Sequence, residues 1–89
     1  MPQLSRFYGI VIMMYPEPGN PHHLPHFHAR YSGMNAVYQI FPVSLLKGQM
    51  PGPQSTLIET WAKTHQQELA DNWARLQRGE SALPITPLP

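Results

Sequence analysis

The chain has 89 residues, of which 42% are hydrophobic and only 12% are charged, and its formal net charge at pH 7 is +1. A chain of this length supports one modest core, and its composition is that of a folded domain rather than a disordered segment. The small net charge argues against a nonspecific nucleic-acid binder, because neutralising several phosphates needs a concentrated basic patch.

The cellular compartment is indicated by what the sequence lacks. It has no cysteine, which excludes disulfides and thiolate metal ligands and fits a reducing environment. No stretch approaches the roughly 20 apolar residues that a membrane-spanning helix needs, and the N-terminal residues do not have the pattern of a signal peptide. We therefore expect a cytoplasmic protein that does not enter a membrane.

The first apolar segment, residues 6–15 (RFYGIVIMMY), is rich in aromatic and β-branched residues. This composition predicts a strand, which ends at the prolines and glycine of residues 16–21. Gly9 indicates a bend or a bulge within it.

A second strand is predicted from His26 to Tyr31, where apolar and polar side chains alternate. We expect its apolar residues to face the core and its polar residues to project from the opposite face of the sheet. The apolar set is Phe27, Ala29 and Tyr31, and the polar set is His26, His28 and Arg30.

Turn-forming residues at 32–35 (SGMN) predict that residues 36–41 (AVYQIF) return as an antiparallel third strand. A short fourth strand is possible around residues 43–47, where Pro42 restricts it to a sheet edge or a bulge. Residues 54–78 contain no proline or glycine and have apolar residues at helical spacing, which predicts one amphipathic helix. At 1.5 Å per residue this helix, roughly 36 Å long, exceeds the sheet, so one end overhangs or the helix breaks.

These elements predict a single α+β domain over residues 1–80, in which a three- or four-stranded antiparallel sheet is followed by one long amphipathic helix packed on one face. Residues 81–89 are proline-rich and should form an extended C-terminal tail that either docks through its apolar residues or remains mobile. The side chains that we expect to be buried are Phe27, Ala29, Tyr31, Ile40, Leu57, Ile58, Trp61 and Leu69.

Four segments occur in the order that is typical of one family: LSRFYGIVIMMY, HFHARYSGMNAVYQI, LKGQMP and WAKTHQQELADNWARLQRGE. On these motifs the chain resembles the small bacterial DUF4160 family over nearly its whole length. The resemblance implies a fold but no activity, because the function of that family is unassigned. Genes of the family often lie beside the gene of another small protein of unknown function. This arrangement is similar to that of toxin–antitoxin modules.

Two departures from the family pattern affect the expected site. The loop and strand NPHHLPHFH are longer and richer in proline than the family's N-P-P-H-F-H. His22 and His23 are therefore in part an addition to the family pattern. The turn IFPVSLLKG lacks the acidic residues that members usually carry there. A role that depends on a carboxylate in this turn is not expected in this chain.

Histidine is concentrated in one place, since four of the five histidines lie within seven residues. Rings at strand positions i and i+2 point the same way about 7 Å apart, so His26 and His28 could converge on one zinc or nickel ion. A third ligand would come from the preceding loop, from His22, His23 or Glu17, or from a neighbouring strand. His65 lies on the apolar helix face, and we interpret it as a core or boundary histidine packed on Trp61.

Other interpretations of the cluster remain open. The histidines could be polar surface residues of low charge, or they could contact an anionic partner. They could also serve as general acid and base, with Arg6 and Arg30 as phosphate clamps.

Two classes of function follow from these interpretations. The first is a small binding or regulatory module, similar to a toxin–antitoxin component, that docks another protein or a second copy of itself through the histidine-rich loop and strand. The alternative is a metal-dependent hydrolase or an RNA-cleaving toxin that uses the cluster of His26 and His28. The absence of cysteine, the few acidic residues and the lack of a serine nucleophile motif argue against the enzyme. A nucleic-acid partner has weaker support than a protein partner.

Overall fold

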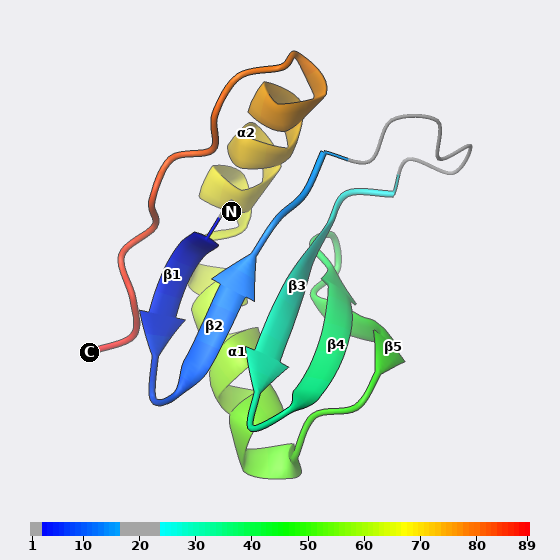
Figure 1. The fold of residues 1–89 in the computed structure, drawn as a ribbon, viewed down its shortest axis with the longest axis vertical. Coiled ribbons are helices and arrows are strands. Elements are labelled where there is room, and N and C mark those ends of the chain that lie inside the picture. The colour runs from blue at the N-terminus through cyan, green and yellow to red at the C-terminus, as the bar shows by residue number, and fades with distance from the viewer. Residues whose placement is uncertain (1–2, 17–23) are drawn as a thin grey trace.

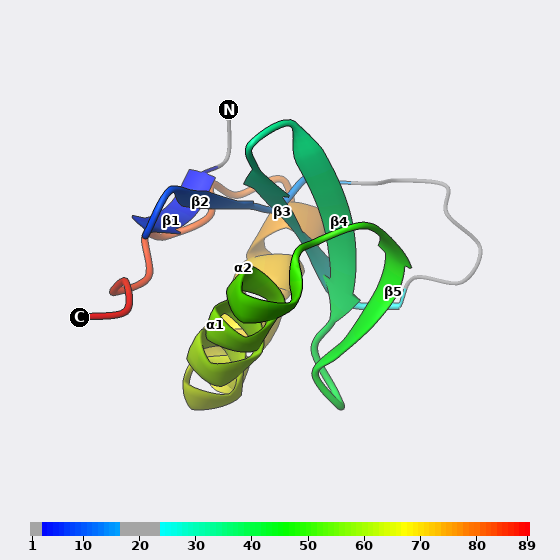
Figure 2. The same ribbon diagram turned by 90° about the horizontal axis from the view of Figure 1, so that it is seen from below.

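The computed structural model describes residues 3–16 and 24–89. Within them, a five-stranded antiparallel sheet precedes two helices that lie on one side of the sheet (Figures 1 and 2). Neither of these helices is long and apolar enough to cross a membrane. The elements are β1 (Gln3–Phe7), β2 (Ile10–Met13), β3 (His26–Tyr31), β4 (Met34–Gln39), β5 (Ser44–Gly48), α1 (Gly52–Thr64) and α2 (Gln66–Gln77).

The predicted α+β class is confirmed, but the predicted counts of three or four strands and one helix are wrong. Residues 6–15 belong to two strands, β1 and β2, which are joined by a hairpin at Tyr8 and Gly9. Both hairpin residues have positive φ, 50° and 78°, and the β3–β4 hairpin repeats this at Ser32 and Gly33 with 48° and 80°. Positive φ at both positions gives the tight turn whose twist matches that of antiparallel strands.

The strands lie in the sheet in their order along the chain, so β1 and β5 form its edges. β5 therefore occupies the edge position that Pro42 predicted for a strand in this region. Each strand pairs only with its neighbours in sequence, and this simple meander needs no crossover connection.

The helical segment breaks at His65, where φ is −117° and ψ is 26°. The backbone N–H of His65 donates to the carbonyl oxygens of Trp61 and Ala62, which ends α1. Its half-buried ring packs on Trp61 at 5.4 Å between ring centroids, and Nδ1 lies 2.5 Å from a carboxylate oxygen of Glu68. A straight helix would carry its second half past the sheet, whereas the break lets α2 bury Leu69 in the same core.

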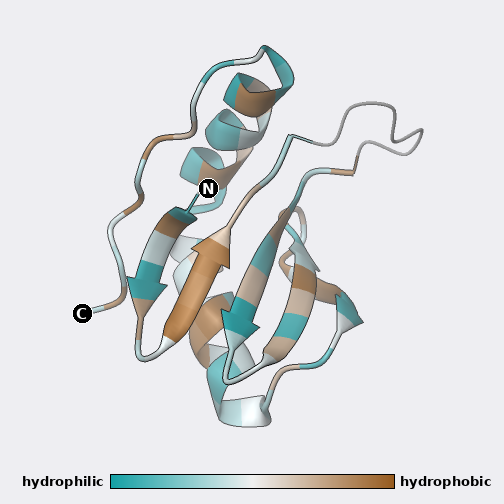
Figure 3. Cartoon of the chain, in the orientation of Figure 1, coloured by the Kyte–Doolittle hydropathy of each residue, from teal (hydrophilic) through white to brown (hydrophobic). Residues whose placement is uncertain are grey.

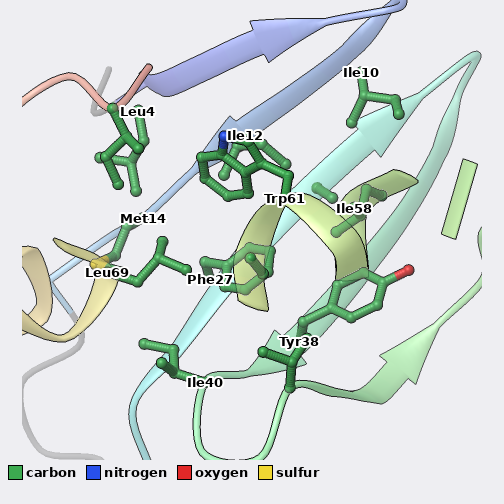
Figure 4. Packing of buried hydrophobic residues seen from close by; sticks show 14 of the residues in the cluster. Leu4, Ile10, Ile12, Met14, Phe27, Tyr38, Ile40, Ile58, Trp61 and Leu69 are labelled. Carbon is green, nitrogen blue, oxygen red and sulfur yellow. The ribbon is translucent and has the colours of Figure 1, made fainter. Parts of the chain in front are cut away.

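The core fills the space between the sheet and the helices (Figure 4). The Trp61 ring is fully buried and lies 5.4 Å from the Phe7 ring and 6.1 Å from the Phe27 ring. In Figure 3, β2 is apolar along its length, while β3 alternates between apolar and polar residues. Six of the eight side chains predicted to be buried are buried, and Tyr31 and Leu57 are partly exposed while packing against the core.

The C-terminal tail, residues 81–89, packs along the outer edge of β1 (Figure 1). The backbone N–H of Ile85 donates to the carbonyl oxygen of Leu4 at 2.8 Å, and the Ile85 side chain is buried. The indole N–H of Trp61 donates to the carbonyl oxygen of Thr86, also at 2.8 Å. Of the two alternatives for the tail, the structure therefore has the docked one.

The buried side chain of Asn72 on α2 fixes the start of the tail. Its amide nitrogen donates to the carbonyl oxygen of Leu83 at 2.9 Å, and its amide oxygen accepts from the Leu83 N–H at 2.8 Å. The two bonds satisfy both backbone groups of one tail residue. Arg75 of α2 adds a bond from Nε to the carbonyl oxygen of Ser81 at 2.8 Å, so two side chains of α2 hold the start of the tail.

Replacing Asn72 by alanine should lower the free energy of unfolding by about 1–3 kcal/mol, because two backbone groups lose their partner. Chemical denaturation of both proteins measures this difference. The matched control is Gln67→Ala on the exposed side of α2, where the amide donates to the Asp71 carboxylate. The control should stay within about 0.5 kcal/mol of the unsubstituted protein. Equal stability of all three proteins would show that Asn72 does not hold the tail.

Candidate functional site

The candidate site lies on the face of the sheet opposite the helices, which we call the open face. No helix or strand of the described residues covers it (Figure 2). On β3, Phe27 and Ala29 are fully buried in the core, while His28 is half-buried and Arg30 is exposed on the open face. The predicted orientation is therefore confirmed for these four residues of the strand.

Two arginines on the open face belong to one row of cross-strand neighbours. Arg6 of β1 lies opposite Val11 of β2, and Val11 lies opposite Arg30 of β3. Cross-strand neighbours point to the same face, and adjacent strands are 4.7–4.9 Å apart, so the two arginine backbones are about 10 Å apart. The sheet thus brings together the two arginines that we predicted as phosphate clamps.

The next row contains His28 and a lysine that the sequence did not single out. His28 lies opposite Val37 of β4, and Val37 lies opposite Lys47 of β5. Lys47 is exposed, and its side chain points to the same face as Arg6 and Arg30. Its position was missed because it lies in a short edge strand whose register against β4 shifts between Leu45 and Lys47, so that regular alternation does not predict which residue lies opposite Val37.

The acidic residues that the structure describes lie on the helix side of the molecule. None of the five strands contains Asp or Glu. On the helix side, Glu80 forms ion pairs with Arg75 at 3.4 Å and with Arg78 at 3.0 Å, and the hydrogen bond from Arg78 lowers the pKa of the Glu80 carboxyl group. Within the described residues, the three cations of the open face have no such ion pair. The described acids are Glu59, Glu68, Asp71 and Glu80.

His26 differs from His28 in its surroundings, although the two ring centroids are only 5.4 Å apart. Its residue is 7% exposed, its ring lies 4.8 Å from the ring of Trp73 on α2, and Nδ1 lies 2.7 Å from the carbonyl oxygen of Leu24. The expectation that both rings project from the open face is therefore wrong for His26. α2 extends to the end of the sheet where β3 begins (Figure 1), which brings Trp73 of α2 to the His26 ring.

Aromatic and sulfur contacts hold the ring of His28. The Tyr15 ring meets it edge-on at 4.9 Å, and the Tyr15 hydroxyl donates to the sulfur of the buried Met13 at 3.3 Å. Met13 is also the cross-strand neighbour of His28. Tyr15 was missed as a site residue, but continuing the alternation of β2 from Val11 through Met13 places it on this face.

The described residues do not make up a complete metal site. Within residues 3–16 and 24–89, no group of three or more His, Cys, Asp or Glu side chains could hold a metal ion. The proposed third ligands His22, His23 and Glu17 lie outside the described residues. The zinc or nickel site therefore stays a prediction.

A family model for the domain of unknown function DUF4160 matches residues 9–74. The chain belongs to this family. The matched region includes His26, His28, Arg30 and Lys47, while Arg6 and the tail lie outside it. No curated protein and no solved structure matches the chain.

Replacing His26 by alanine should lower the free energy of unfolding by about 1–3 kcal/mol, because the ring packs on Trp73 and bonds a carbonyl oxygen. His28→Ala, two residues further along the same strand, is the matched comparison. It should lower the free energy of unfolding by less than about 1 kcal/mol, because the His28 ring is only half-buried. Urea denaturation of the two variants measures both values. A larger loss for His28→Ala would contradict the distinction between a packing histidine and a surface histidine.

Proposed function

We propose that this member of the DUF4160 family is a small binding module with a regulatory, toxin–antitoxin-like role. It would dock an acidic segment of a partner protein on the open face, with β3 and the histidine-rich loop before it forming part of the contact. The observation that supports this is the separation of charge, with Arg6, Arg30 and Lys47 on strands that contain no acid. Complementary charge of this kind steers association and selects the partner.

The residues between the cations favour a protein segment over nucleic acid. Val11 separates Arg6 from Arg30, and Val37 separates His28 from Lys47, and both valines are half-buried. A segment in which acidic and apolar side chains alternate would match this pattern. Nucleic acid offers no apolar side chains, and three cations could neutralise only about three phosphates, which gives weak, salt-sensitive binding.

We place this activity in the cytoplasm, because a chain without cysteine has no disulfide that the reducing conditions there would break. The open face would be available in a monomer and in a homodimer alike if the dimer contact lay elsewhere on the molecule. The partner would then bind either form.

The double variant Arg6→Glu/Arg30→Glu should bind the partner at least tenfold more weakly than the unsubstituted protein. The reason is that two attractive contacts become repulsive, which costs about 1.4 kcal/mol or more. The partner is first recovered by pull-down from native cells, and its affinity for the purified protein is then measured by calorimetry at low and high salt.

The control is Lys63→Glu, which reverses one charge on the exposed side of α1 and is matched to each of the single variants Arg6→Glu and Arg30→Glu. It should leave the affinity within a factor of two or so, because it is remote from the open face. Equal weakening by Lys63→Glu, or an affinity that does not change with salt, would contradict docking on the open face.

A second candidate function is RNA cleavage or metal-dependent hydrolysis. It is favoured by the position of His28 and Arg30 two residues apart on β3, with Arg6 in the adjoining row. In that case His28 would be a general acid or base and the arginines would hold a phosphate. We place this function second because the buried His26 ring is already used in packing on Trp73, so acid–base chemistry would depend on His28 alone among the described histidines of β3.

Zinc and nickel titration distinguishes these functions. If the protein is a binding module, the ring resonances of His26 and His28 should be unchanged in NMR spectra at millimolar metal, and a labelled RNA should stay intact with or without EDTA. Shifts at both residues together with His22 or His23 would support the metal site. Such a site should lose affinity as pH falls through about 6.5, because a ligand must be a neutral imidazole.

A further inference from the structure

The three cations of the open face lie on every second strand, so a ligand that contacts all of them must cross the strands. Arg6 is on β1, Arg30 on β3 and Lys47 on β5, and all three are exposed. Arg6 and Arg30 share one row of cross-strand neighbours, whereas Lys47 belongs to the row of His28, two residues away along β3. The register therefore places the cations on a shallow diagonal across the sheet.

Strand geometry gives the positions of the groups along this diagonal. Adjacent strands are about 4.8 Å apart, and two residues along a strand span about 7 Å. Counted from Arg6, Arg30 lies at about 9–10 Å and Lys47 at about 20 Å along the diagonal. Val11 lies at about 5 Å, between the first two cations, and Val37 at about 16 Å, between the last two. Cations and half-buried valines thus alternate along one line.

An α-helix that lies along the diagonal matches these positions. Its residues i, i+3, i+7, i+10 and i+14 form one stripe, and at 1.5 Å per residue they lie at about 0, 4.5, 10.5, 15 and 21 Å along the axis. Each of them comes within about 1.5 Å of a cation or a valine along the line. The sheet twists by about 20–25° per strand, so successive cations differ in direction by about 45°, which the long side chains of Arg and Lys accommodate.

An extended segment that crosses the sheet does not match them. Its side chains that face the sheet are about 7 Å apart and lie at about 0, 7, 14 and 20 Å. The first and last match Arg6 and Lys47, but only two side chains remain for Arg30 and the two valines, so one of these groups has no partner. The face of a sheet also offers no backbone partner to an extended segment, whereas a helix satisfies its own backbone groups.

We infer that the partner segment is an amphipathic α-helix with acidic residues at i, i+7 and i+14 and apolar residues at i+3 and i+10, which is about four turns long. The inference rests on the proposed function, because it describes the segment that docks on the open face. Its carboxylates contact Arg6, Arg30 and Lys47, and its apolar side chains cover Val11 and Val37. The docked helix would complete three layers, with helices on both faces of the sheet.

Three synthetic peptides test the inference, each with three Glu and two Leu residues. The first is a helix of about 18 residues, held by a lactam bridge on its far side, with Glu and Leu in the inferred positions. The second is the same helix with these five residues distributed around its circumference. In the third, Glu and Leu alternate in an extended segment rich in Thr. Fluorescence anisotropy at low salt should show at least fivefold tighter binding of the first peptide, because it alone brings all five groups to their partners.

Charge reversal tests the register of the docked helix. Arg30→Glu should weaken binding of the first peptide at least fivefold, and a Glu→Lys change at i+7 of the peptide should restore it. The same change at i should not restore it, because that position contacts Arg6 or Lys47. Lys63→Glu on α1 is the control and should leave binding of the first peptide unchanged.

The outcomes separate the inferred helix from the proposed docking of an acidic segment. Equal binding of all three peptides, or tighter binding of the extended one, would overturn the helix. If Arg6→Glu/Arg30→Glu weakened that binding, docking of an acidic segment on the open face would still hold. Tighter binding of a single-stranded RNA of similar length than of any peptide would overturn both proposals. Failure of every peptide to bind at millimolar concentration would overturn the helix, while the partner recovered from cells tests the proposed function independently.

Discussion

Burial of the Trp61 ring joins the three parts of the molecule. The ring packs on Phe7 of the sheet and on His65 at the helix break, and its N–H donates to the carbonyl oxygen of Thr86 in the tail. A buried indole N–H needs a hydrogen-bond partner, and here that partner lies in the tail. If the tail left β1, the buried indole N–H of Trp61 would lose its hydrogen-bond partner, and the folded state would be less stable. Closure of the β1 edge therefore depends on the packing at the centre of the core.

The core in turn determines what the open face carries. β3 contributes Phe27 to the core and His28 to the open face, and a shift of one residue would exchange them. Because Phe27 lies against Trp61 and stacks on Tyr38, the register that buries it also orients His28 and Arg30. Packing on the helix side thus positions the groups on the side that has no helices.

Local periodicity predicted the elements whose apolar residues repeat regularly along the chain. It did not predict features that depend on a single backbone conformation or on contacts between distant segments. The alternation of β3 and its orientation could be predicted because side chains of a strand repeat every two residues. The β1–β2 hairpin was missed because Tyr8 adopts a positive φ that the sequence gives no reason to expect beside Gly9. The break at His65 depends on the length of the sheet, and the contact of His26 with Trp73 depends on where α2 ends up.

The charge of the open face is a property of the topology. Arg6, Arg30 and Lys47 are far apart in the sequence, and only the meander brings their strands into one sheet. The described acidic side chains lie on the helices and just after α2, and none lies on a strand. The same topology that gathers the three cations therefore also keeps the described carboxylates away from them, which leaves their charge available to an acidic partner.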